Sequence, residues 1–212
     1  MMSDGIQVLV AGEELAQARG AVVMIHGRGA SAESILALAE SLGTEGLALL
    51  APQAAGGAWY PYSFLAPLEQ NEPSLSAALA TIGATLDAVA AAGVPAERTV
   101  LLGFSQGACL ATEFAARNAQ RYGGVVALSG GLIGPDGTPR DYAGSLGDTP
   151  VFLGCSDVDF HIPHARVVES AEILRGLGGT VEMRIYPGMG HTVNEDELEA
   201  VQVILDSVRS AS

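Results

Sequence analysis

Short apolar runs alternate with segments of helical periodicity along most of this 212-residue chain. The run AVVMIH (Ala21–His26) is apolar almost throughout, which is typical of a strand that is covered on both faces. Strands separated by helices join in parallel, because a helical crossover returns the chain to the same end of the sheet. The pattern therefore predicts an α/β fold with an open, mostly parallel central sheet and helices on both faces.

The expected elements follow from these runs and from capping residues. The predicted strands are Ile6–Val10, Ala21–His26, Gly46–Pro52, Thr99–Phe104, Tyr122–Gly130, Pro150–Cys155 and Thr180–Pro187, and the first is expected to form half of a leading hairpin. One predicted helix follows Ser31, and three more span about Leu75–Ala92, Gln106–Asn118 and Ala165–Leu177. The last begins at Asn194, where Glu197 completes a capping box. No repeat or linker divides the chain, so we expect residues 1–212 to form one domain.

Charge and composition narrow the class of partner. The chain has 10 basic and 24 acidic residues, a net charge of −14 that disfavours nucleic acid and anionic membrane surfaces. The first twenty residues contain acids, and no uninterrupted apolar run reaches about 18 residues, so we expect neither a signal peptide nor stable membrane insertion. Cys109 and Cys155 lie in apolar stretches and are read as buried free thiols, which favours a cytoplasmic location.

One polar residue interrupts the apolar strand-to-helix stretch TVLLGFSQGACLATEFAAR (Thr99–Arg117). Ser105 stands at the joint, and GFSQG fits the pattern G-x-S-x-G of a nucleophile elbow. Gly103 and Gly107 would relieve crowding at a strained turn, and the helix N-terminus would point free N–H groups at a developing negative charge. The stretch predicts a serine nucleophile at the carboxyl end of a central strand, where sites form in such sheets.

A serine nucleophile needs a base and an acid that orients it, and in this fold type they follow the serine in the order acid, then histidine. Of the four histidines, only His191 follows the last predicted strand, in YPGMGHTV. Asp157 and Asp159 both follow PVFLGC, and strand alternation would point them the same way, so spacing leaves the choice between them open.

Four segments in this order resemble the signature segments of the phospholipase/carboxylesterase family: HGRGAS, GFSQGA, SDVDFHIP and YPGMGH. That family has the α/β-hydrolase fold and includes acyl-protein thioesterases and bacterial esterases. Its pattern D-x-D-x-x-V-P, aligned on Ile162–Pro163, implies that Asp159 is the acid and that Asp157 shapes the loop. The resemblance also implies an oxyanion hole formed by the backbone N–H groups of Arg28 and Gln106.

The resemblance leaves the side chain of Arg28 without a role, since the family often has an apolar residue there. Two hypotheses are a contact with an anionic or carbonyl group of the substrate and a salt bridge to one of the many acids. The long aromatic loop Gln53–Pro73 is expected to form the wall that binds substrate, a role assigned to Trp59, Tyr60, Phe64 and Leu65.

Together these features predict a carboxylesterase-type serine hydrolase that needs no cofactor or metal and acts on small-molecule acyl esters. The gap Gly131–Thr149 is too short for a cap domain, so an open site is expected. Thioester hydrolysis by the same residues and a non-catalytic binding module remain alternatives, whereas a dienelactone hydrolase would place Cys at the elbow. A metal site formed by Asp157, Asp159, His161 and His164 is a further, less favoured alternative. The family also suggests a possible homodimer.

Overall fold

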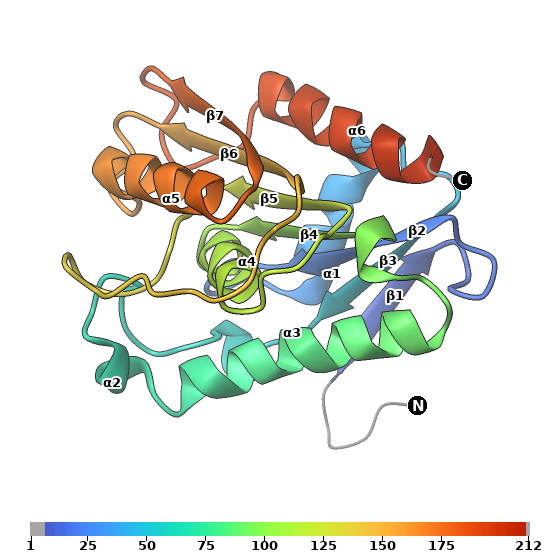
Figure 1. Ribbon diagram of the computed structural model, residues 1–212, viewed down its shortest axis with the longest axis horizontal. Coiled ribbons are helices and arrows are strands. Elements are labelled where there is room, and N and C mark those ends of the chain that lie inside the picture. Colours follow the sequence, from blue (N-terminus) through green and yellow to red (C-terminus); the bar gives the residue numbers. More distant parts are fainter. Residues whose placement is uncertain (1–6, 211–212) are drawn as a thin grey trace.

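The computed structural model describes residues 7–210, and a seven-stranded sheet runs through its centre (Figure 1). The strand order is β1-β3-β2-β4-β5-β6-β7, with every neighbouring pair parallel except β1 and β3. The strands are β1 (Val8–Gly12), β2 (Gly20–Ile25), β3 (Leu47–Pro52), β4 (Thr99–Phe104), β5 (Gly124–Leu128), β6 (Pro150–Ser156) and β7 (Thr180–Tyr186). The predicted α/β architecture is confirmed.

Helices cover the sheet on both faces. They are α1 (Ala32–Leu38), α2 (Leu68–Asn71), α3 (Ser74–Ala91), α4 (Gln106–Arg117), α5 (His164–Gly176) and α6 (Glu195–Ser210), with short 3₁₀ turns at Ala39–Ser41, Ala55–Gly57 and Ala96–Arg98. In Figure 1, α3, α4 and α5 lie on one side of the sheet, and α1 and α6 lie on the other. Within the described residues no helix interrupts the segment between β5 and β6, so no cap domain covers the carboxyl ends of the strands there.

Successive side chains of the central strands point alternately to the two faces of the sheet and so pack into two different cores. Val23 and Ile25 of β2 belong to the core beneath α3, α4 and α5, whereas Val22 and Met24 belong to the core beneath α1 and α6. All six residues of β2 are buried, as expected for a strand with helices on both sides. The uninterrupted apolar run in the sequence therefore reflects two cores that share one strand.

The predicted leading hairpin is wrong. β1 pairs antiparallel with β3, with Val8 opposite Pro52, and it forms the edge of the sheet. Both edges of β2 are occupied by its parallel partners β3 and β4, so no edge remains for the strand that precedes it. Of the predicted strand Ile6–Val10, Ile6 lies outside the described residues.

Helix α3 is the one helix in the described part of the chain whose length and mean hydropathy, 1.4, would allow it to cross a membrane. The sequence contains no uninterrupted apolar run of that length, because serine, threonine, glycine and one aspartate are interspersed with alanine and leucine. In the structure Leu75, Ile82 and Val89 form a stripe at helical spacing that packs beneath the sheet. The apolar side of α3 is thus used to cover β2 and β3.

Glu197 is a fully buried carboxylate in the first turn of α6. It forms the predicted capping box, since Asn194 N–H donates to Glu197 Oε2 at 2.9 Å and Glu197 N–H donates to Asn194 Oδ1 at 2.8 Å. Its Oε1 has no hydrogen-bond partner among the described residues and faces Gly154, where a Cβ atom would lie 2.1 Å away. Burial raises the pKa of Glu197 to about 7, with a smaller upward contribution from the charge of Asp196 and an opposing one from the Asn194 N–H.

This pKa makes stability depend on pH in a defined direction. The unfolded chain loses the Glu197 proton near the usual glutamate pKa of 4.5, whereas the folded protein keeps it to about pH 7. The contribution of the protonated carboxyl is therefore fully present below pH 4.5 and is lost as pH rises through 7. The difference in free energy of unfolding between Glu197→Gln and the unmodified protein should therefore change with pH. We expect it to shift in favour of the variant by about 2 kcal/mol between pH 4 and pH 8. Urea denaturation across this pH range measures the difference, and parallel pH curves for the two proteins would contradict the expectation.

Candidate active site

Ser105 occupies a strained turn between β4 and α4. Its φ of 56° and ψ of −119° lie in a region that residues with side chains rarely adopt. The glycines on either side permit the turn, since a Cβ atom on Gly103 would lie 2.2 Å from the Gly107 carbonyl oxygen. A Cβ atom on Gly107 would lie 2.0 Å from the carbonyl oxygen of Ile25 in β2. Close packing of α4 on two strands thus exposes the serine hydroxyl at the carboxyl ends of the strands.

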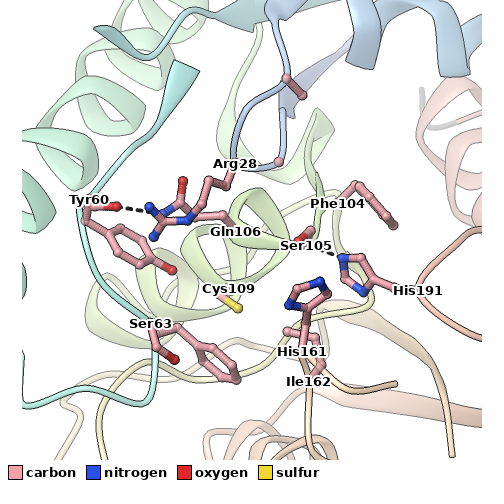
Figure 2. A pocket seen from close by; sticks show the side chains of 13 residues that line it. Arg28, Tyr60, Ser63, Phe104, Ser105, Gln106, Cys109, His161, Ile162 and His191 are labelled. Atoms are coloured by element: carbon pink, nitrogen blue, oxygen red, sulfur yellow. Dashed lines mark hydrogen bonds between the residues drawn. The ribbon is translucent and has the colours of Figure 1, made fainter. Parts of the chain in front are cut away.

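The structure brings His191 and Asp159 into a hydrogen-bonded chain with Ser105. His191 Nε2 lies 2.9 Å from Ser105 Oγ, and His191 Nδ1 lies 2.6 Å from Asp159 Oδ2 (Figure 2 shows the serine and histidine). Because a carboxylate only accepts, Nδ1 carries the proton that it donates to Asp159, and Nε2 is free to accept the serine proton. The three side chains therefore have the order and geometry of a nucleophile, a base and an orienting acid.

The surroundings of Asp159 keep it ionised. Burial of its carboxylate acts to raise its pKa, but hydrogen bonds from His191 and from the N–H groups of His161 and Ile162 outweigh burial and hold the pKa below its usual value. The second candidate, Asp157, has a different position: its Oδ1 accepts from the N–H of Gly188 at 2.8 Å. Geometry thus separates two aspartates that spacing could not.

The loop that carries His191 is held at two points in front of β6. Asp157 binds Gly188, and Ser156 Oγ accepts from the N–H of Gly190 at 3.0 Å. Both glycines have positive φ, 68° and 79°, so the loop turns tightly on either side of Met189. Sequence reasoning missed Ser156, whose signal is its place directly before Asp157 at the end of a buried strand.

The alternative reading of this loop as a metal site has no geometric support in residues 7–210, where no group of three or more His, Cys, Asp or Glu side chains converges. Asp157 and Asp159 are bound to separate partners, Gly188 and His191. His164 is the first residue of α5, and His161 packs edge-on against the ring of His191, with 4.8 Å between the ring centroids.

Two residues beside Ser105, Arg28 and Gln106, have backbone N–H groups with no acceptor among the described residues. Gln106 is the first residue of α4, so its N–H has no acceptor within the helix, and Arg28 lies in the loop after β2. No hydrogen bond from either N–H to another described residue is present. Both residues line the cavity beside Ser105, in the positions predicted for an oxyanion hole.

Buried His26 holds the loop after β2 in place. His26 Nε2 accepts from the N–H of Ala54 at 3.1 Å, so the proton lies on Nδ1, which donates to the carbonyl of Gly27 at 2.8 Å. Burial lowers the pKa of His26 and keeps the ring neutral. Trp59 Nε1 donates to the His26 carbonyl at 2.9 Å, and the two rings pack with centroids 5.0 Å apart.

The side chain of Gln106 joins the elbow to the aromatic loop. Its Oε1 accepts from the N–H of Trp59 at 2.9 Å, and its Nε2 donates to the carbonyl of Tyr60 at 3.0 Å. The residue is buried, and Figure 2 shows its amide directed at the Tyr60 backbone. We infer that Gln106 also positions the wall of the cavity, a role that the sequence pattern did not indicate.

The side chain of Arg28 forms no salt bridge within the described residues. Instead it donates to two backbone carbonyls, from Nη1 to Pro61 O at 2.8 Å and from Nη2 to Tyr62 O at 2.6 Å. Its guanidinium also lies 5.8 Å from the centroid of the Tyr60 ring. The salt-bridge hypothesis is therefore wrong, because loop carbonyls provide the acceptors that acids were expected to provide.

The cavity beside Ser105 has a volume of about 350 Å³. Tyr60 and Phe64 line it, as predicted for the aromatic loop. Trp59 and Leu65 do not: Trp59 is buried beneath the loop by its bonds to His26 and Gln106, and Leu65 packs against the core. Sequence reasoning had not assigned several other lining residues to the substrate wall. They include Phe104 at the end of β4, Cys109 in α4 and His161 in the loop that carries Asp159.

Comparison with known proteins gives matches to one family of enzymes. A family model described as phospholipase/carboxylesterase matches residues 6–209. The crystal structure of a phospholipase/carboxylesterase from Dyadobacter fermentans is 43% identical, with a TM-score of 0.92 over 97% of this chain and 99% of that one. Acyl-protein thioesterase 1 of Gibberella zeae is 34% identical over 53% of this chain, and a probable carboxylesterase of Arabidopsis thaliana is 25% identical over 63%. These two matches span about half the length of each curated relative, 49% and 51%.

The contact between α4 and β2 gives a test that requires no activity. We expect Gly107→Ala to destabilise the protein by about 3 kcal/mol or more, because the added Cβ meets the Ile25 carbonyl and neither backbone can yield. The matched control is Gly83→Ala in α3, where the nearest atom is a Phe114 ring carbon at 3.6 Å and alanine favours the helix by about 1 kcal/mol. Urea denaturation measures both. Equal effects of the two substitutions would show that the approach at Gly107 does not constrain the elbow.

Proposed function

Because the chain belongs to the phospholipase/carboxylesterase family, we propose that it hydrolyses carboxylic acyl esters through a Ser105–His191–Asp159 triad. The observation that carries this proposal is the unbroken hydrogen-bonded chain from Ser105 Oγ through His191 to Asp159, at 2.9 and 2.6 Å. The proposed substrate is a small-molecule acyl ester that enters a site with no cap domain over it.

In the first half of the proposed reaction, Ser105 Oγ attacks the ester carbonyl carbon while His191 Nε2 accepts the hydroxyl proton. The negative charge formed on the carbonyl oxygen is stabilised by the N–H groups of Arg28 and Gln106, each worth about 3 kcal/mol in such sites. His191 then donates its proton to the leaving oxygen, the ester C–O bond breaks, and an acyl-enzyme remains on Ser105.

In the second half, His191 takes a proton from a water molecule that attacks the acyl-enzyme, and Ser105 leaves with that proton to regenerate the hydroxyl. Asp159 keeps Nδ1 protonated throughout and stabilises the positive charge that forms on His191. The same groups would hydrolyse a thioester, and the name of the Gibberella zeae relative, acyl-protein thioesterase 1, makes that the second candidate activity.

Covalent labelling separates hydrolysis from a non-catalytic role. A fluorophosphonate probe should form an adduct on Ser105 that peptide mapping locates, and Ser105→Ala should abolish both labelling and hydrolysis of p-nitrophenyl butyrate. A folded protein that is neither labelled nor active would support the binding-module alternative. Parallel assays with oxygen esters and thioesters of the same acyl chain decide between the two hydrolytic activities.

The two aspartates provide a matched pair for testing the acid. Asp159→Asn should lower kcat by roughly 10³- to 10⁴-fold, because an asparagine no longer holds the required tautomer of His191. Asp157→Asn should cost about tenfold or less, because it weakens only the bond to the Gly188 N–H at the base of the loop. Steady-state kinetics with p-nitrophenyl butyrate measures both, and losses of similar size would contradict the assignment.

The hydrogen bonds from Arg28 to the carbonyls of Pro61 and Tyr62 predict how the effect of an Arg28 substitution depends on substrate charge. We expect Arg28→Met to lower kcat/KM by about tenfold for neutral and anionic esters alike, because the side chain acts by holding the loop at Pro61 and Tyr62. The control is Arg98→Met, which also removes bonds to two carbonyls, those of Arg19 and Gly93, but at the opposite end of the sheet. A loss confined to anionic esters would instead show direct contact between Arg28 and substrate.

A further inference from the structure

A second hollow, which we term the α1 groove, lies next to the cavity beside Ser105 and shares lining residues with it. The groove has a volume of about 280 Å³ and is lined chiefly by Ile35 and Leu38 of α1, Phe104 at the end of β4, and Val193. Gly27, Ala30 and Phe104 line both hollows, so the two are neighbours, with the loop after β2 and the end of β4 at their shared border.

The α1 groove is apolar, in contrast to the cavity. Its one titratable lining residue, His26, uses both ring nitrogens in bonds to Gly27 and Ala54 and keeps none for a ligand. Its other polar side chain, Ser34, donates to the carbonyl of Ser31 within the first turn of α1. The groove thus presents hydrocarbon surface to whatever enters it.

We propose that the α1 groove binds the hydrocarbon part of the alcohol that leaves from the ester; this assignment rests on the proposed function. The reacting carbonyl carbon of an ester bears an acyl chain on one side and an alcohol group on the other. Both need space beside Ser105 while the carbonyl oxygen faces the N–H groups of Arg28 and Gln106. The cavity on the side of Tyr60 and Ser63 provides one such space. Figure 2 shows Phe104, which borders the groove, on the other side of Ser105.

The position of His191 decides which substituent lies in the groove. The ring of Phe104 packs on the His191 imidazole with centroids 5.0 Å apart, and Val193 follows His191 by two residues. The leaving oxygen must lie beside His191 to receive its proton, so a group attached to that oxygen continues naturally along Phe104 and Val193. The acyl group instead extends toward Phe64 and Cys109, where the cavity reaches the buried core.

The wild-type protein provides the first test. With butyrate esters of methanol, butanol and hexanol, kcat/KM should rise by about three- to fourfold for each methylene that the groove buries. In addition, with p-nitrophenyl butyrate as acyl donor, added hexanol should capture the acyl-enzyme as hexyl butyrate more efficiently than methanol does, because the same groove binds the attacking alcohol. Chromatography of the two ester products measures this partition. An absence of both trends would overturn the proposal.

Two leucines of α1 provide a matched pair of variants. Leu38 lines the groove, whereas Leu36 is also half-buried in the same core but lies outside it. Leu38→Gln should lower the hexyl-to-methyl ratio of kcat/KM by about tenfold, and Leu36→Gln should leave that ratio unchanged. Thermal unfolding of both variants identifies any general loss of structure.

The outcomes separate this inference from the proposed function. If Leu38→Gln instead flattens the dependence on acyl length in p-nitrophenyl esters, the groove holds the acyl group and the inference is overturned. A hexyl-to-methyl ratio that does not change in Leu38→Gln overturns it as well. If the wild-type protein hydrolyses none of these esters and no probe labels Ser105, the proposed function itself has failed.

Discussion

The first turn of α4 lies so close to the end of β2 that no Cβ atom fits between Gly107 and the carbonyl oxygen of Ile25. This approach sets the geometry of the site. It forces Ser105 into a positive φ, which projects its hydroxyl beyond the strand ends, and it places the free N–H of Gln106 beside the loop that follows β2. The exposed position of Ser105 and of the Gln106 N–H therefore follows from one backbone contact, and Gly107 is required by packing rather than by flexibility.

Buried polar groups connect that contact to the wall of the cavity. Gln106 binds the backbone of Trp59 and Tyr60, and Trp59 in turn donates to the carbonyl of His26. All four residues are buried, so breaking one bond would leave a polar group without water or a partner. Arg28 binds the same segment from the surface. The long aromatic segment is thus held by hydrogen bonds from the loop after β2 and from Gln106, and its own regular structure is limited to α2 and the 3₁₀ turn Ala55–Gly57.

The sequence predicted the parts of the fold and site that depend on local pattern. Apolar runs and helical spacing indicated the layers, and G-x-S-x-G at a strand–helix joint indicated Ser105. The parts that failed depend on contacts between distant segments. The pairing of β1 with β3 follows from which strand edges remain free, and the burial of Trp59 follows from an acceptor at His26. An aromatic loop residue has no local signal that shows whether it lines the cavity, and of the adjacent Trp59 and Tyr60, which are both buried in the core, only Tyr60 does so.

The different hydrogen-bond partners of the two aspartates follow from a short turn. Alternation would direct Asp157 and Asp159 to the same side only if the strand continued, but β6 ends at Ser156. Beyond that point Asp159 Oδ1 accepts the N–H groups of His161 and Ile162, which leaves Oδ2 directed at His191. Asp157 is left to bind the backbone of the His191 loop. The turn therefore directs one carboxylate at His191 and the other at the backbone of the His191 loop, because each carboxylate is oriented by the backbone N–H groups within its reach.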